Sequence, residues 1–213
     1  VWEARQVAQL AARQRRATQM GTQIHAEPNY RRVVEIVRSG VLGPVREVHT
    51  WVRKVWSGAP LAPNPPAAPS NVHWDLWLGP ASERAFHPDL IPAKWRGYWE
   101  YGNGTLGDMG CHHMDLAFWA LDLRHPETVR AEGPPVDPDR TPEWLTVEYR
   151  FPARGQKPPV TLTWYDGDRY PPILKEVGAP EWGGGNLFVG EKGMLLADYS
   201  RWKLWPEKDF KEF

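Results

Sequence analysis

Two acidic residues and a histidine recur at helical spacing in the stretch GTLGDMGCHHMDLAFWALDL, residues 104–123. With about 3.6 residues per turn, Asp108 and His112 lie one turn apart on one face of a helix, and Asp115 follows on nearly the same stripe. A histidine, with an ordinary pKa of about 6.5, can accept a proton from an alcohol, and a neighbouring carboxylate can orient its ring. The spacing therefore predicts a proton-handling face, with His112 as general base and Asp108 as its partner.

The same residues allow other uses. Asp108 could charge the start of the helix, and His112 could be an interior histidine whose hydrogen bonds are satisfied. Asp108, His112 and Asp115 could also hold a metal, but adjacent His112 and His113 cannot face one point, and we expect no metal site. Cys111, the single cysteine, lies away from the polar stripe, so we expect a buried small residue rather than a nucleophile.

A glycine-rich turn precedes this helix, and the segment GNGTLGDMGCHHMD resembles a known signature. The resemblance is to the glucose-fructose oxidoreductase, inositol dehydrogenase and rhizopine-catabolism family of NAD(P)-dependent oxidoreductases (Gfo/Idh/MocA). That family carries Asp-x-Gly-x-His after a glycine-rich turn and before a hydrophobic helix. In the family this aspartate and histidine lie beside the substrate hydroxyl that is oxidised, which the resemblance assigns to Asp108 and His112. Some members use bound NAD for redox-assisted glycoside cleavage, so that reaction stays open.

The first 44 residues have the pattern helix, strand, helix. Residues 1–16 place apolar side chains at helical spacing, the run QMGTQ (19–23) is typical of a short strand, and residues 25–40 predict a second helix. SGVLGPV (39–45) resembles the end of the family's Rossmann domain, so we expect an α/β Rossmann remnant over residues 1–44. The sequence contains no GxGxxG fingerprint, and the resemblance places the main site for NAD or NADP upstream of Val1.

Residues 45–213 are expected to form an α+β catalytic and oligomerisation domain. Alternating apolar residues predict strands over 45–56, 127–133, 143–151 and 159–167, and NLFVGEKGMLLAD predicts a hairpin. The proline-rich residues 57–71 predict a surface loop inside this domain rather than a linker between domains. We expect an open, mostly antiparallel sheet flanked by helices. The chain ends without an obvious stop signal, so we also expect truncation there.

Several further residues are candidates for substrate contact. Arg96, within KWRGYW, could bind sugar hydroxyls while Trp95 or Trp99 stacks on the apolar face of a sugar ring. Gln23 and His25 follow the predicted strand, where the family often places polar residues facing the active site. The alternative is that these two are polar surface at the start of a helix.

Composition limits the kinds of partner. Lys plus Arg and Asp plus Glu both number 26, so charge gives no reason to expect nucleic acid or an anionic membrane. No stretch approaches the roughly 20 apolar residues that span a bilayer. The resemblance implies reversible hydride transfer between NAD(P) and a hydroxyl of a sugar, cyclitol or glycoside, in a homo-oligomer, dimer or tetramer. We expect a cytoplasmic protein, with export to the periplasm open because the N-terminus is missing. The tryptophan-rich composition also allows a non-catalytic carbohydrate-binding or oligomerisation module, and bound zinc or manganese would favour a metal-dependent hydrolase.

Overall fold

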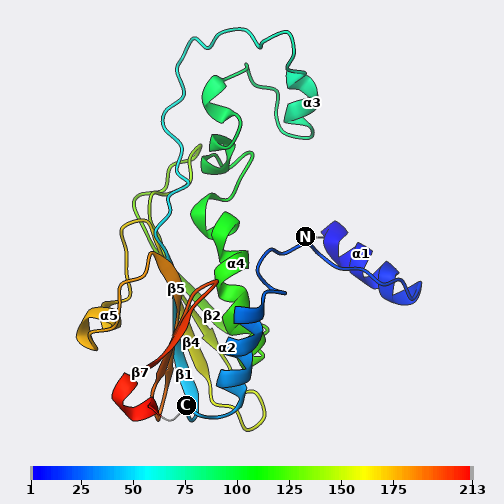
Figure 1. The fold of residues 1–213 in the computed structure, drawn as a ribbon. Helices are drawn as coiled ribbons and strands as arrows, with labels where there is room; N and C mark the ends of the chain where they lie inside the picture. The colour runs from blue at the N-terminus through cyan, green and yellow to red at the C-terminus, as the bar shows by residue number, and fades with distance from the viewer. Residues whose placement is uncertain (1, 212–213) are drawn as a thin grey trace.

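The computed structural model describes residues 2–211 as one sheet with helices on its faces and a long arm (Figure 1). The elements, in chain order, are α1 (Trp2–Arg13), α2 (Pro28–Arg38), β1 (Val45–Val52), α3 (Trp74–Leu78), η1 (Pro88–Leu90), η2 (Lys94–Gly97), α4 (Gly104–Leu121), β2 (Thr128–Glu132), β3 (Thr146–Phe151), β4 (Val160–Asp166), α5 (Pro172–Glu176), β5 (Gly184–Gly190), β6 (Met194–Ala197), β7 (Trp202–Trp205) and η3 (Glu207–Phe210). Among residues 2–211, no helix is long and apolar enough to cross a membrane.

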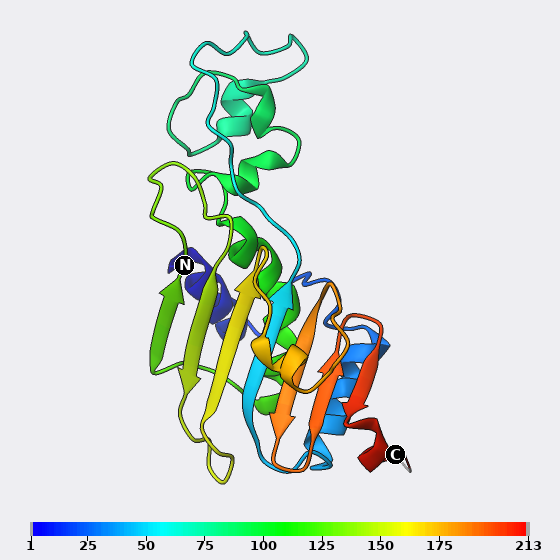
Figure 2. The ribbon, with the colours of Figure 1, turned by 90° about the vertical axis from the view of Figure 1, so that its left-hand side faces the viewer.

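The sheet has seven strands in the order β2-β3-β4-β1-β5-β6-β7 (Figure 2). Neighbouring strands are antiparallel except for β1 and β4, which are parallel. Parallel neighbours need a long crossover, and here the arm, α4 and the β2–β3 hairpin provide it. The expected open, mostly antiparallel sheet with flanking helices is therefore confirmed, with one parallel pair at its centre.

Helices α2 and α4 lie side by side against one face of the sheet (Figure 1). The apolar residues of α4 recur at helical spacing in its C-terminal half, where Leu116, Ala117 and Ala120 are buried. They pack against Val33 and Val37 of α2 and the sheet beneath. Alanine side chains let the two helices approach closely, so α4 is fixed along its lower half while its first turns extend beyond the core.

A second apolar cluster covers the opposite face at β1 and β5. Trp51, Leu187 and Leu196 are buried there with Leu174 of α5. Because β1 is covered on both faces, its side chains are buried on both sides from Val48 to Val52. This central strand carries the chain directly to the arm.

The N-terminal segment differs from the prediction. Helix α1 forms, but the strand predicted over 19–23 is wrong, because residues 16–22 have no regular structure. A strand needs a neighbour to pair its backbone groups, and none of the described strands lies beside this segment. Helix α1 stands away from the sheet (Figure 1) and has no buried residue, with Trp2 69% and Val7 64% exposed. The structure of residues 2–44 thus shows no Rossmann fold.

The arm, residues 53–103, leaves β1 and returns to α4 (Figure 1). The proline-rich residues 57–71 lie within it, and β4 pairs with β1 after the arm has returned, as expected for an internal loop. At its base the amide of Gly58 and the amide of Thr141 both donate to the carbonyl of Gly97, at 3.1 and 2.9 Å. The Thr141 hydroxyl also donates to the carbonyl of Trp56 at 2.6 Å. These bonds fix the arm beside α4.

Close packing at this base predicts a cost for any side chain at Gly97. A Cβ there would overlap the backbone of Ser57 and Gly58, and neither backbone can move without breaking the bonds just described. We expect Gly97→Ala to lower the free energy of unfolding by roughly 1–3 kcal/mol, the usual cost of overpacking. Gly183→Ala is the matched control, because a methyl group at that position would have no other atom within 4 Å. Urea unfolding of both variants tests this, and equal midpoints would contradict it.

Candidate active site

The first turns of α4 carry the predicted chemical residues. Asp108 and His112 are partly exposed there. The hydroxyl of Tyr30, a buried residue of α2, donates to the backbone carbonyl of His112 at 2.9 Å. This bond ties the turn that bears His112 to α2, so the position of the imidazole is set by the packing of two helices.

Asp108 is held by the arm and not by His112. Its Oδ1 accepts from Nε of Arg96 at 2.9 Å, and its Oδ2 accepts from the indole nitrogen of Trp56 at 2.5 Å. Both side chains of the ion pair are about a quarter exposed, 29% for Arg96 and 26% for Asp108. The expectation that Asp108 orients the His112 ring is therefore corrected: within residues 2–211 its hydrogen-bond donors are an arginine and a tryptophan. A charge-assisted pair of this kind fixes the carboxylate where the arm meets α4.

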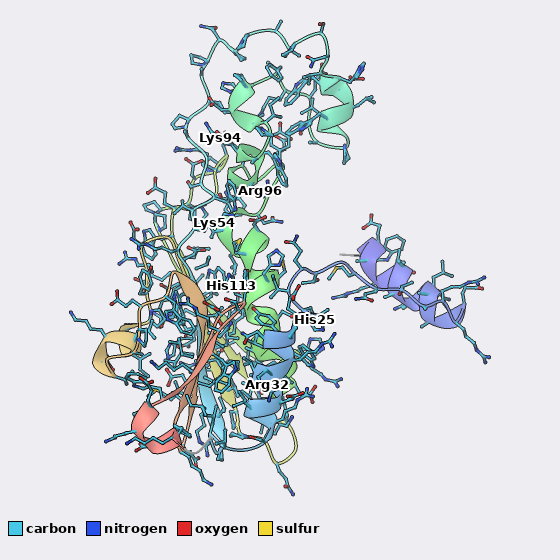
Figure 3. All side chains as sticks on the ribbon, viewed as in Figure 1. His25, Arg32, Lys54, Lys94, Arg96 and His113 are labelled. Atoms are coloured by element: carbon cyan, nitrogen blue, oxygen red, sulfur yellow. The ribbon has the colours of Figure 1, made fainter. Side chains whose placement is uncertain are left out.

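The arm also brings cations and indoles together beside Asp108. Arg96 lies over the Trp95 ring at 4.5 Å and over the Trp56 ring at 5.2 Å, and Lys54 lies over the same Trp56 ring at 4.6 Å. Lys54 and Arg96 appear together at the upper end of α4 in Figure 3. Such cation–π contacts hold the charges in place without neutralising them. The two predicted residues Trp95 and Arg96 thus lie at the site.

The neighbouring histidines have different surroundings. His113 is buried, its Nε2 lies 2.9 Å from the hydroxyl of Tyr199, and the two rings stack at 4.6 Å. Burial, and secondarily the charge of His112, lowers the pKa of His113 to about 4. His112 is only partly buried, and its ring makes no hydrogen bond among the described residues. The two histidines thus differ in exposure and in hydrogen bonding, and His112 is the more exposed.

Of the two residues predicted to face the site from the N-terminal segment, the structure brings His25 to α4 and leaves Gln23 away from it. His25 Nδ1 lies 2.7 Å from Oδ2 of Asp115, and its ring stacks on Trp119 at 4.5 Å (Figure 3). His25 therefore meets α4 one turn beyond His112. Gln23 is exposed, and in residues 2–211 its side chain makes no hydrogen bond, so the structure does not bring it to the site.

Other residues at the site were not predicted. Trp56 and Lys54 follow strand β1, and Tyr199 follows the predicted hairpin. The only sequence signal for Trp56 was its place at the start of the arm, and nothing marked Tyr199. Cys111 is exposed, so its expected burial is wrong: it lies on the solvent side of α4 between Gly110 and His112.

The side chains and backbone turns of the described residues determine whether they could bind a metal ion or a dinucleotide. Among residues 2–211 no three side chains of histidine, cysteine, aspartate or glutamate are grouped as metal ligands. A dinucleotide is typically held by a glycine-rich turn at a helix N-terminus, and the segment between α1 and α2 contains a single glycine, Gly21.

Comparison with known proteins identifies the family. Residues 27–157, more than half of the chain, match the family model of the Gfo/Idh/MocA oxidoreductases described as "Oxidoreductase family, C-terminal alpha/beta domain". No sequence among the curated proteins matches the chain.

Several solved structures share the fold. An oxidoreductase from Thermotoga maritima is 14% identical with a TM-score of 0.55, covering 98% of this chain and 54% of that one. The WlbA dehydrogenase from Bordetella pertussis, in complex with NADH and UDP-GlcNAcA, is 16% identical with a TM-score of 0.58, covering 99% and 55%. The super-repressor mutant of Gal80p from Saccharomyces cerevisiae is 14% identical with a TM-score of 0.58, covering 94% and 46%.

At these identities the similarity concerns the fold. The chain spans about half the length of each of these three proteins. The family match, the sheet with α2 and α4 on one face, and the Asp-x-Gly-x-His turn on α4 agree with one another. This chain belongs to the Gfo/Idh/MocA oxidoreductase family, whose C-terminal α/β domain it contains.

Proposed function

We propose that this chain is the substrate-binding and proton-transfer part of an NAD(P)-dependent oxidoreductase that acts on a hydroxyl group of a sugar, cyclitol or glycoside. The observation that carries the proposal is the state of His112. Within residues 2–211 the His112 ring makes no hydrogen bond, whereas the side chains of Asp108, Asp115 and His113 on the same helix each make at least one. His112 is thus the imidazole left to receive a hydroxyl proton.

The surrounding groups would hold the substrate. A carboxylate has about four acceptor positions, and Asp108 uses two, for Arg96 and Trp56. The remaining positions can accept from a sugar hydroxyl and hold it beside His112, while the face of Trp95 that Arg96 leaves open can stack on a further part of the substrate. The nicotinamide, when bound, supplies the hydride acceptor. The part played by this chain is to orient the hydroxyl and to take its proton.

The division of the chain belongs to the same proposal. We move the predicted boundary at residue 44 and assign residues 1–26 to the end of a nucleotide-binding domain and 27–213 to the catalytic and oligomerisation domain, because the C-terminal domain match begins at residue 27 and α2 packs in the main core. Support comes from α1, whose apolar residues Trp2, Val7 and Leu10 are exposed and would be buried against further protein. Within residues 2–211, the sheet face opposite α2 and α4 is covered by the short helix α5 and its connecting loops (Figure 2), which supports a dimer or tetramer formed through that face.

The direct test is cofactor reduction by the protein expressed from its complete reading frame. NAD⁺ and NADP⁺ are offered with a panel of hexoses, uronic acids, inositols and aryl glycosides, and reduced nicotinamide and released aglycone are both measured. Reduction with a hydroxyl substrate supports the proposal, and aglycone release without net reduction indicates NAD-assisted cleavage. Sugar binding without turnover would overturn the proposal and indicate a non-catalytic binding module. The ion pair between Asp108 and Arg96 favours that alternative.

A further inference from the structure

A cleft on the arm lies next to the site just described and is separate from the α4 surface around His112. Its volume is about 520 Å³, and its walls include Trp77, Pro80, Trp95, Glu100 and Tyr101. Small-molecule sites usually have volumes of roughly 300–1,000 Å³ and are mostly apolar with a few placed polar groups. This cleft matches that description in size and in composition.

The aromatic walls are fixed in place from behind. The Trp77 ring stacks on Trp74 at 4.5 Å with an angle of 12° between the planes, and the Trp74 indole donates to the carbonyl of Arg84 at 2.7 Å. Trp95 is covered on one side by the guanidinium of Arg96 at 4.5 Å. Trp77 also meets the Tyr101 ring, with the ring centres 5.2 Å apart, so both indoles are held by neighbouring groups and little ordering entropy remains to be lost when a ligand covers the surface left open.

Polar groups at the cleft are held in place by hydrogen bonds and ion pairs, and some of them lack a hydrogen-bond partner. Glu100 accepts from the amide of Ser82 at 2.8 Å, and its other oxygen lies 3.6 Å from Arg84. The Ser82 hydrogen bonds lower the pKa of Glu100, so it is a carboxylate at neutral pH. The hydroxyl of Tyr101 and Nη1 of Arg84 are shielded from solvent and have no hydrogen-bond partner among residues 2–211. Of these two residues Tyr101 lines the cleft, and shielded donors without partners are uncommon in proteins.

We propose that this cleft binds a second pyranose ring of a glycan whose first ring reacts at His112. A pyranose has apolar C–H faces, which stack on indoles, and a hydroxyl rim, which suits a carboxylate and a phenol. Glu100 lines the cleft, and Arg84 lies 3.6 Å from it but pairs more closely with Asp139 at 2.9 Å, so the cleft has no excess positive charge and suits an uncharged ligand better than a phosphate. Arg96 connects the candidate active site with the cleft. Its Nε donates to Asp108 at 2.9 Å, and its guanidinium covers one face of Trp95, which lines the cleft. The inference rests on the proposed function for the first ring.

The test is binding by titration calorimetry to the complete protein. Cellotriose, maltotriose and chitotriose are each compared with the corresponding methyl monosaccharide. We expect at least one trisaccharide to bind about tenfold or more tightly than its monosaccharide, and Trp77→Ala to remove that gain. Trp77→Phe, which keeps an aromatic ring, is expected to keep part of it. Leu76→Ala is the matched control, since Leu76 neighbours Trp77 on α3 and is 74% exposed.

The outcomes separate this inference from the proposed function. Trisaccharides that bind no better than monosaccharides, or a gain unchanged in Trp77→Ala, would overturn the second-ring site even if sugars are oxidised. Trp77-dependent binding of adenosine without any trisaccharide gain would also overturn it. A chain-length gain lost in Trp77→Ala supports the site, and it does so even if no cofactor reduction is found.

Discussion

Replacing His112 with alanine is expected to lower kcat by roughly 10²- to 10⁴-fold, the size of a general acid–base contribution. The reason is the arrangement on α4: the backbone carbonyl of His112 accepts from the Tyr30 hydroxyl, and its partly exposed ring makes no hydrogen bond within residues 2–211. The neighbouring imidazole cannot replace it, because His113 is buried against Tyr199. The measurement is cofactor reduction by the complete protein at saturating sugar.

The control for this variant is His125→Ala, since His125 is exposed just beyond the end of α4. It should leave kcat and KM unchanged. His112→Ala should affect kcat far more than KM, because the proton is transferred in the reaction and not on binding. A variant that keeps more than a third of the wild-type kcat would exclude His112 as the base.

The sequence could place Asp108 and His112 on one face of a helix, but it could not predict their contacts with the rest of the chain. Asp108 and His112 are four residues apart on a helix, so their common face follows from helical geometry alone. The partner of Asp108 could not be found in that way, since Trp56 is 52 residues away in the sequence and is brought back by the arm. The spacing of residues along a helix or strand predicts only contacts within that element. The Asp108–Arg96 pair depends on how a long loop returns, which is a property of tertiary packing.

For the fold, too, local structure could be predicted from the sequence, whereas contacts between distant segments could not. Strands and α4 were predictable because apolar residues alternate or recur at helical spacing. The parallel pairing of β1 with β4 was not, because it depends on the path of the crossover between them. The predicted strand at 19–23 failed for a related reason: its local pattern suits a strand, but no described strand lies beside it to complete a ladder.

The second large effect concerns pH and His113. Its pKa is about 4 in the folded chain and 6.5 ordinarily, because burial disfavours the charged ring. Between these values the unfolded chain binds more protons at this residue than the folded chain does. The contribution of the neutral His113 ring to the free energy of unfolding is fully present above pH 6.5, and it is lost as the pH falls toward 4. The shift corresponds to about 3 kcal/mol of unfolding free energy, at roughly 1.4 kcal/mol per pKa unit.

His113→Phe isolates this contribution, because phenylalanine keeps a ring against Tyr199 but cannot be protonated. Near neutral pH the variant should be less stable than the wild type by about 1 kcal/mol, since the hydrogen bond to the Tyr199 hydroxyl is lost. As the pH falls the wild type should lose stability faster, and the order of the two should reverse before pH 4. Urea unfolding at several pH values measures the difference, with His125→Phe as the exposed control. Parallel stability curves for wild type and His113→Phe would mean that the buried ring does not resist protonation, and the distinction between the two histidines of α4 would then fail.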